Sequence, residues 1–146
     1  MALESQHPIH NYALLFSQLT PDNLSDIAEL VSDDVVFSDP FNLTYGRNKF
    51  IRIFQHMFDV IENPKFEILD VSFSSRAGYI KWRLTGKVKK WKQIIIDITG
   101  ISEVISDEAG QITAHYDHWD SSSQLLVAIP ALGLPIAWLL NLFRLK

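Results

Sequence analysis

The chain has 146 residues, of which 47% are hydrophobic and 12% aromatic. This length fits one domain with one hydrophobic core, and the composition excludes a disordered chain. The formal net charge is −4 and no long run of basic residues occurs, so no nucleic acid partner is expected. The absence of cysteine excludes a disulfide scaffold, a thiol nucleophile and a thiolate zinc site.

The first third of the chain is predicted to be mainly helical. Residues 1–9 are interpreted as a loose tail that lacks the pattern of a signal peptide, so we expect a cytoplasmic protein. Helices are predicted over 10–18 and 24–31, where apolar residues recur at helical spacing. A short β-branched strand is predicted to follow over 35–38.

The third predicted helix runs from about residue 46 to residue 61. One of its faces carries aromatic side chains at helical spacing, which is typical of packing on a core: Phe50, Phe54 and Phe58. Lys49 and Arg52 are interpreted as its solvated face.

Beyond this helix the hydrophobic pattern changes to a period of two, which indicates strands. The first of these strands is predicted over 69–73, with Leu69, Val71 and Phe73 on its apolar face. In the next strand, apolar residues alternate with polar ones and predict one buried face, formed by Ile80, Trp82 and Leu84.

A long strand over 93–105 and a last strand over 112–119 complete the predicted sheet. The long strand has isoleucines on both faces, with Ile95 and Ile101 on the face opposite to Ile96. This pattern favours one face on the core and the other on a partner, so we expect a homodimer. Helices first and antiparallel strands after them predict an α+β fold, organised as a single domain over 1–146.

The C-terminal part, 121–146, is predicted to be an apolar helix or tail. Between Leu125 and Phe143 only Asn141 is clearly polar. Three interpretations stay open: the segment folds over the open end of the domain or packs in a dimer, it lies in a membrane interface as an anchor, or it spans a membrane. Pro130 and Pro135 argue against the span, because prolines inside a span need support from neighbouring helices.

Three stretches carry a resemblance to a known superfamily. They are Asn23–Pro40, which reads NLSDIAELVSDDVVFSDP, the following Gly46-Arg47, and His115–Asp120, which reads HYDHWD. These stretches resemble the NTF2-like superfamily, and within it the SnoaL-like and ketosteroid-isomerase-like domains. The resemblance covers roughly residues 10–143. It implies a cone in which three N-terminal helices pack on a strongly curved antiparallel sheet around an apolar pocket, and a homodimer.

The resemblance assigns roles to three residues of the isomerase type. Asp39 in FSDPF is similar to the aspartate general base of ketosteroid isomerases, and Tyr12 is similar to their first-helix tyrosine, the oxyanion donor. The third residue of that set is a protonated aspartic acid, and Ser102 stands near its place here, which is a departure from the pattern. Aspartate before proline is also a common turn residue, so a turn role for Asp39 stays open.

Asp117 in HYDHWD is similar to the last-strand aspartate of the epoxide hydrolases of this superfamily and to an acid/base aspartate of its polyketide cyclases. The hydrolases need a partner Arg-x-Asp on a central strand. The equivalent stretch, 81–85, contains Arg83 but no aspartate. A structural pair of Asp117 with Arg83 or with a histidine is the alternative.

The residues themselves support an acid/base role for the two aspartates, because a carboxylate against aromatic walls loses hydration and becomes a usable base. Strand alternation places His115 on the same face as Asp117, where a His–Asp pair would orient the imidazole. Two ligands two residues apart are a weak metal signal, so neither a metal nor a cofactor is predicted. The expected pocket walls are Trp82, Trp119, Phe37, Phe54 and Ser102.

Two functions stay open, one enzymatic and one not. The first is a SnoaL-like pocket protein for a small apolar, oxygenated ligand such as a polyketide, steroid-like or lipid-derived molecule, with cofactor-free acid/base chemistry as isomerase, cyclase or hydrolase. Asp39 or Asp117 would take the proton, and Tyr12, Ser102 or His115 would donate a hydrogen bond to the developing oxyanion. The second is a non-catalytic ligand-binding or interaction module, with its apolar tail at a membrane surface.

Overall fold

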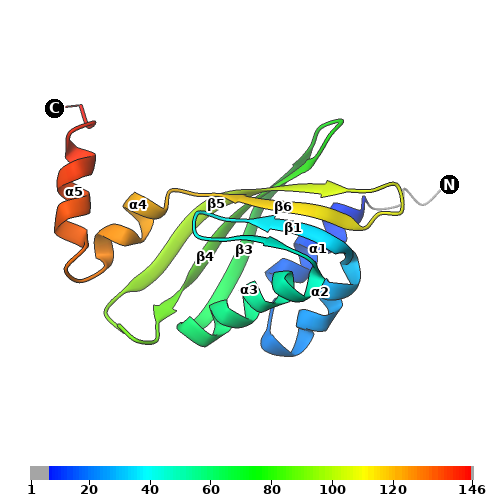
Figure 1. The fold of residues 1–146 in the computed structure, drawn as a ribbon, viewed down its shortest axis with the longest axis horizontal. Coiled ribbons are helices and arrows are strands. Elements are labelled where there is room, and N and C mark those ends of the chain that lie inside the picture. The colour runs from blue at the N-terminus through cyan, green and yellow to red at the C-terminus, as the bar shows by residue number, and fades with distance from the viewer. Residues whose placement is uncertain (1–6, 146) are drawn as a thin grey trace.

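The computed structural model describes residues 7–145 (Figure 1). In this part of the chain, N-terminal helices pack on a curved, unclosed sheet, and a helical segment follows the last strand. This arrangement confirms the predicted α+β fold of the NTF2-like type.

The first helix, α1, covers Pro8–Ser17 and starts earlier than predicted. Pro8 occupies its first turn, where a proline ring already has the helical φ angle, and Ile9 is 1% exposed. These two residues therefore belong to the helix and not to the predicted loose tail. Residues 1–6 of that tail lie outside the described residues.

Two further α-helices precede the long strands. After a 3-10 turn, η1 (Pro21–Asn23), α2 covers Leu24–Leu30. The third helix, α3, covers Arg47–Val60, within one residue of its predicted ends. Both α2 and α3 run directly into strands, so no loop separates helix from sheet at these points.

The sheet has six strands, and the last one in the chain lies in its interior. The strands are β1 (Val31–Ser38), β2 (Leu43–Tyr45), β3 (Ile61–Phe73), β4 (Gly78–Val88), β5 (Ile95–Ser106) and β6 (Ile112–His118). Their order in the sheet is β2-β1-β6-β5-β4-β3. β1 and β6 pair in parallel, whereas the other neighbours pair antiparallel, as predicted.

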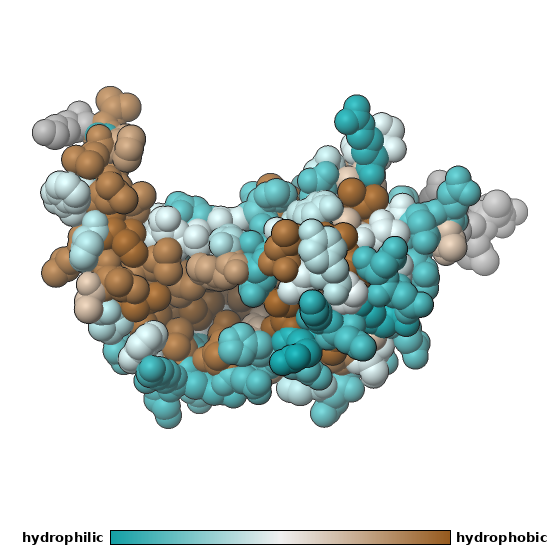
Figure 2. Space-filling view, viewed as in Figure 1, coloured by the Kyte–Doolittle hydropathy of each residue, from teal (hydrophilic) through white to brown (hydrophobic). Residues whose placement is uncertain are grey.

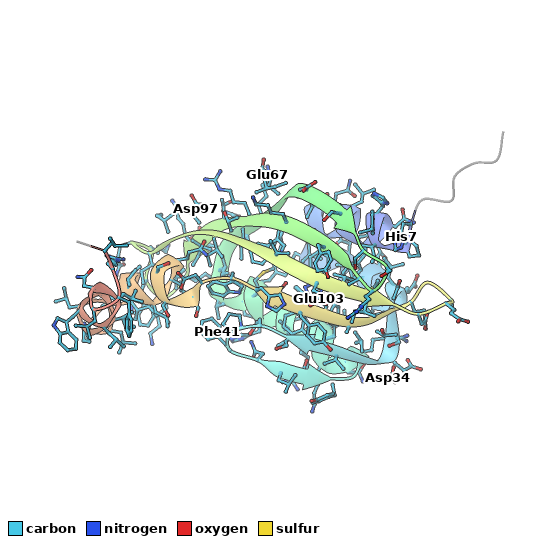
Figure 3. The ribbon with its side chains drawn as sticks, turned by 90° about the horizontal axis from the view of Figure 1, so that it is seen from above. His7, Asp34, Phe41, Glu67, Asp97 and Glu103 are labelled. Atoms are coloured by element: carbon cyan, nitrogen blue, oxygen red, sulfur yellow. The ribbon has the colours of Figure 1, made fainter. Side chains whose placement is uncertain are left out.

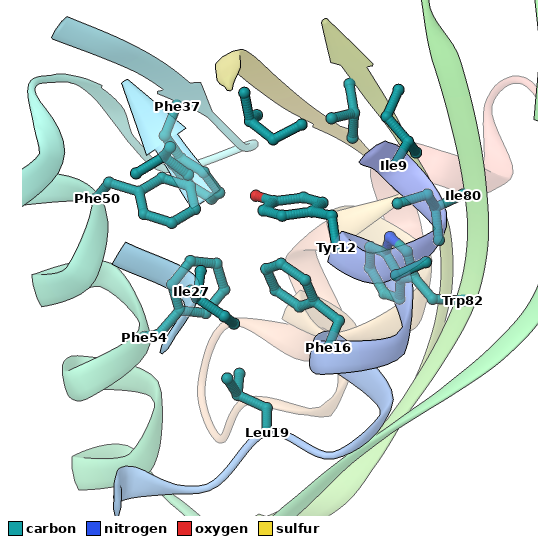
Figure 4. Packing of buried hydrophobic residues seen from close by; sticks show 14 of the residues in the cluster. Ile9, Tyr12, Phe16, Leu19, Ile27, Phe37, Phe50, Phe54, Ile80 and Trp82 are labelled. Carbon is teal, nitrogen blue, oxygen red and sulfur yellow. The ribbon is translucent and has the colours of Figure 1, made fainter. Parts of the chain in front are cut away.

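The concave face of the sheet and the helices enclose an aromatic core (Figure 4). The predicted buried face of β4 is confirmed, since Ile80, Trp82 and Leu84 are 2%, 5% and 8% exposed. Tyr12 lies among phenylalanine side chains from α1, β1 and α3. Large rings of this kind bury the most apolar surface per residue and position the polar groups among them.

The outer face of the sheet carries charged side chains, and Arg83 is one of them. Its guanidinium donates two hydrogen bonds of 2.7 Å to the carboxylate of Asp97 on β5. Glu67 on β3 stands opposite Arg83, and Figure 3 labels Glu67 and Asp97, whose strands β3 and β5 flank β4 in the sheet. The alternative in which Arg83 pairs with Asp117 is therefore wrong, because strand alternation turns Arg83 outward where Trp82 turns inward.

The predicted apolar face of β3 is confirmed at Val71, which packs on the core, and is wrong at Leu69. The core-facing side chains are Phe66, Ile68 and Val71, whereas Leu69 is 44% exposed. Phe73 is 41% exposed at the end of the strand, and the centroid of its ring lies 4.4 Å from that of His7. The register between β3 and β4 shifts between Ile68 and Asp70. A β-bulge of this kind adds one residue to the strand and reverses which side chains face the core.

The C-terminal segment stands beyond the end of the sheet (Figure 1). It consists of α4 (Ser121–Gln124), η2 (Leu126–Ala128) and α5 (Gly133–Asn141), and α5 packs on η2. Figure 2 shows its apolar side chains as a brown surface, and Leu134 and Phe143 are each 86% exposed. Within residues 7–145, no helix combines the length and apolar character needed to cross a membrane. The dimer and membrane-interface interpretations stay predictions.

Candidate functional site

A chain of five polar side chains crosses the aromatic core. It starts at Trp82 on β4, passes through Ser102 on β5 and Asp117 and His115 on β6, and ends at Tyr12 on α1. We call these five side chains the network. Burying a polar group costs free energy unless the group is hydrogen-bonded, and each side chain of the network has a hydrogen-bond partner.

The hydrogen bonds of the network are short and converge on one oxygen. The indole N–H of Trp82 donates to Ser102 Oγ at 2.8 Å, and the Ser102 hydroxyl donates to Asp117 Oδ1 at 2.5 Å. His115 Nε2 lies 2.8 Å from the same Oδ1, and His115 Nδ1 lies 2.7 Å from the Tyr12 hydroxyl. Asp117 Oδ1 therefore receives two hydrogen bonds.

Strand register brings these residues together. His115 and Asp117 are two residues apart on β6 and share its inward face, as predicted. β5 pairs with β6 so that Ser102 stands opposite Asp117. Ser102, which stands near the place of the third residue of the isomerase set, is thus in direct contact with Asp117.

The donors can be ordered because an ionised carboxylate only accepts hydrogen bonds. With Asp117 ionised, His115 Nε2 carries a hydrogen and donates it, which leaves Nδ1 as the acceptor of the Tyr12 hydroxyl proton in a neutral imidazole. Hydrogen bonds are then donated toward Asp117 along two branches, one from Tyr12 through His115 and the other from Trp82 through Ser102. Its hydrogens hold the carboxylate and the imidazole in fixed orientations.

Tyr12 is the most deeply buried member of the network, with no exposed surface. Burial raises the pKa of its phenol well above the ordinary value of 10.0, and the negative charge of Asp117 raises it further. Both causes disfavour the phenolate, so Tyr12 stays a neutral donor throughout the physiological range.

We expect the stability that Tyr12 contributes to be lost in alkaline solution. Because its folded-state pKa is raised, the phenol of the unfolded chain ionises first, and the free energy of unfolding falls as the pH rises above about 10 toward the folded-state pKa. One such group gives a slope of about 1.4 kcal/mol per pH unit. Urea denaturation of the wild type and of Tyr12→Phe, which lacks the ionisable phenol, measures this slope. The difference in the free energy of unfolding between the two proteins should narrow as the pH rises above about 10. A difference that stays constant with pH contradicts the prediction.

Beside the network lies a cavity of about 420 Å³, a volume within the usual range for small-molecule sites. Apolar side chains of α3 and of the inner sheet face form most of its wall. Four of the five predicted wall residues line it: Phe37, Phe54, Trp82 and Trp119. Ser102 instead lines a smaller void of about 20 Å³, which has room for about one water molecule.

Asp117 lines both the cavity and the inner void, and its side chain is 16% exposed. His115, with a side chain 3% exposed, lines only the void. Within residues 7–145, Oδ2 of Asp117 accepts no hydrogen bond. Asp117 therefore presents an uncommitted carboxylate oxygen at the junction between the network and the cavity.

Asp39 also lines the cavity, but its carboxylate is held in the β1–β2 turn. Its Oδ1 accepts hydrogen bonds from the backbone N–H groups of Phe41 and Asn42 at 2.8 and 2.7 Å, and the Asn42 amide donates to it as well. The structure thus gives Asp39 the turn role that its sequence also allowed. A catalytic role for Asp39 stays a prediction.

Tyr12 and Ser102 contact the network rather than the large cavity. Tyr12 lines neither the cavity nor the void, and it reaches a ligand only through His115. The single hydroxyl proton of Ser102 is donated to Asp117. In the cavity wall, Trp119 is a different donor, since its indole N–H makes no hydrogen bond within residues 7–145.

Sequence reasoning missed His56 on α3, which lines the cavity as well. Its spacing of four residues from Arg52 and seven from Lys49 is the signal that would have placed all three on one helix face. Among the described residues, no group of three histidine, aspartate or glutamate side chains is arranged to hold a metal ion.

A protein-family model described as the SnoaL-like domain matches residues 14–116, which is more than half of the chain. The chain belongs to the SnoaL-like domain family. The matched region of this SnoaL-like chain includes Ser102 and His115 and ends one residue before Asp117. No curated protein matches the chain.

Solved structures share the fold of this SnoaL-like protein. A hypothetical protein with a ketosteroid isomerase-like fold from Catenulispora acidiphila, in complex with trimethylamine, has a TM-score of 0.70 at 18% identity, over 91% of this chain and 97% of that chain. An NTF2-like protein from Anabaena variabilis has a TM-score of 0.70 at 13% identity, over 85% and 97%. A steroid delta-isomerase from Pseudomonas aeruginosa has a TM-score of 0.60 at 19% identity, over 93% and 90%. These similarities show the fold.

Proposed function

We propose that this SnoaL-like protein binds a small, largely apolar molecule that carries a carbonyl oxygen, and that Asp117 removes and returns a proton on it. The observation that carries the proposal is the free Oδ2 of Asp117 at the wall of a mostly apolar cavity. Apolar surroundings strengthen electrostatic interactions with a bound ligand and exclude competing water.

Asp117 is oriented for this role by its two hydrogen-bond donors. Ser102 and His115 both hold Oδ1, so Oδ2 is the oxygen that a ligand meets. Tyr12 fixes the imidazole of His115 from the other side. A base held in one position avoids the cost of orienting it at the moment of reaction.

The reaction we propose is proton transfer at the carbon next to the carbonyl group. Oδ2 takes the proton, the C–H electron pair moves into the carbonyl system, and negative charge develops on the carbonyl oxygen. The indole N–H of Trp119, in the same wall as Asp117, supplies a hydrogen bond to that oxygen. Return of the proton from Asp117 to the same carbon or to a conjugated one regenerates the carboxylate and gives exchange or isomerisation.

The fold comparison supports this ligand class. One structure of the same fold is described as a steroid delta-isomerase, which names an apolar, oxygenated substrate class for that protein. Hydrogen bonds from Phe41 and Asn42 hold the carboxylate of Asp39 in the β1–β2 turn, whereas Oδ2 of Asp117 is free, so the acid/base group in this proposal is Asp117 and not Asp39.

The test is deuterium incorporation from D₂O into apolar ketones, followed by mass spectrometry. Cyclohexanone, decalone and a steroid ketone form a series of increasing apolar surface. We expect enzyme-dependent exchange next to the carbonyl, increasing along the series as more of the cavity is filled. Exchange no faster than in buffer for every ketone would overturn the acid/base proposal.

A second candidate function is a non-catalytic binding module, and one observation favours it. The hydroxyl protons of Tyr12 and Ser102 are already donated inside the network, so neither is available to a developing oxyanion. A ligand retained by the purified protein in native mass spectrometry, together with no ketone exchange, would assign this function.

A further inference from the structure

A second hollow adjoins the cavity on the outer side of α3. It encloses about 520 Å³ and lies between α3 and the β1–β2 turn. Asn42, Ile53 and His56 line both this outer hollow and the cavity, so the two spaces meet along these residues. A ligand in the cavity can therefore extend into the outer hollow.

The outer hollow is cationic, whereas the cavity has a mostly apolar wall. Lys49 and Arg52 line it together with His56, all from one face of α3. Asp59 is the acidic residue in its wall. Among residues 7–145, neither Lys49 nor Arg52 forms an ion pair with a carboxylate, so both charges are available to a ligand.

This local positive charge contrasts with the net charge of −4 of the chain. The inner end of the cavity is acidic, because Asp117 lies there. A negatively charged ligand group is therefore repelled from the inner end and attracted to the outer hollow. The cavity and the outer hollow together thus favour one direction of binding, with the anionic end of a ligand in the outer hollow and its uncharged end beside Asp117.

We propose that the ligand is amphipathic, with an anionic group, of the carboxylate or phosphate type, held by Lys49 and Arg52 in the outer hollow. Its apolar body fills the cavity, and its reacting carbonyl end lies beside Asp117. This inference rests on the proposed function and adds the charge and direction of the ligand. Arg52 presents a planar fork of donors that suits either anion, and Lys49 adds a second point charge.

Ligands of one chain length and different head groups provide the test. Decanoate, decyl phosphate and 1-decanol are compared by isothermal titration calorimetry with the full chain. We expect both anions to bind about three- to tenfold more tightly than the alcohol, a modest ratio because the cations are exposed. Whichever anion binds more tightly identifies the head group. High salt should reduce the ratio, since exposed charges are screened.

The double variant Lys49→Gln/Arg52→Gln should remove the preference for anions and leave the affinity for 1-decanol unchanged. Lys65→Gln/Arg76→Gln makes the same change of charge at exposed positions outside the cavity and the hollow, and should keep the preference. Circular dichroism checks that all variants fold.

The outcomes separate this inference from the proposed function. If alcohol and anions bind equally, or if the Lys49/Arg52 variant keeps the preference, the cavity binds ligands but the outer hollow is only a solvated helix face. If none of the three binds, both the pocket and the anion site are wrong. If the control variant loses the preference equally, the effect is one of net charge, and the site is overturned.

Discussion

Asp117→Asn is expected to lower the rate of ketone deuterium exchange by about 10²- to 10⁴-fold, the usual contribution of a positioned acid/base group. The amide oxygen can still accept hydrogen bonds from Ser102 and His115, so the network keeps its shape. An amide cannot accept a proton at the pH of the assay, so only the chemical step is lost. Ligand affinity, measured by calorimetry with decalone, should change much less than the rate.

Two other aspartates make this prediction specific. Asp97→Asn makes the same chemical change on the outer face of the sheet, where Asp97 pairs with Arg83, and should leave the exchange rate unchanged. Asp39→Asn tests the base that the isomerase resemblance implies. Loss of exchange in the Asp39 variant with retention in the Asp117 variant would move the base to the β1–β2 turn.

A double-mutant cycle on Tyr12 and His115 is expected to show strong coupling in stability. Tyr12→Phe leaves His115 Nδ1 buried without its donor, and His115→Leu leaves the Tyr12 hydroxyl buried without its acceptor. Each unsatisfied group costs about 1–3 kcal/mol. The double variant has neither, so it should be more stable than the sum of the single changes implies, by about 1–3 kcal/mol.

Urea denaturation at neutral pH gives the four free energies of unfolding. His115→Leu also removes a donor from Asp117, but this loss occurs in both the single and the double variant and cancels in the coupling. Additive free energies would show that the 2.7 Å contact between Tyr12 and His115 contributes nothing to stability, which contradicts the network as described.

Much of the fold could be predicted because its hydrophobic periods are regular. The alternation of Ile80, Trp82 and Leu84 gave the buried face of β4, and the spaced phenylalanines gave α3. The bulge at Leu69 could not be predicted, because an extra residue reverses the alternation without any local signal in the sequence. Nor do local patterns show that β1 pairs in parallel with a strand that starts at Ile112, since this pairing depends on the whole sheet.

In the candidate site, contacts between residues of one strand could be predicted from the sequence, but contacts between residues of different strands could not. Alternation on β6 was enough to place His115 with Asp117. The bond from Trp82 to Ser102 depends on the register of β4 and β5, and so does the pairing of Arg83 with Asp97. Lys49 and Arg52 had the pattern of a solvated helix face, and only the three-dimensional structure shows the hollow beside them.

The interior position of β6 has a consequence for how the protein is made. During synthesis the β1–β2 pair and the β3–β5 sheet emerge first, and each presents an unpaired edge until β6 is available to insert between them. That insertion joins distant parts of the chain, which is a slow class of folding event. His115 and Asp117 arrive on the same strand, so a nascent chain acquires its complete sheet and the His115–Asp117 pair in one step.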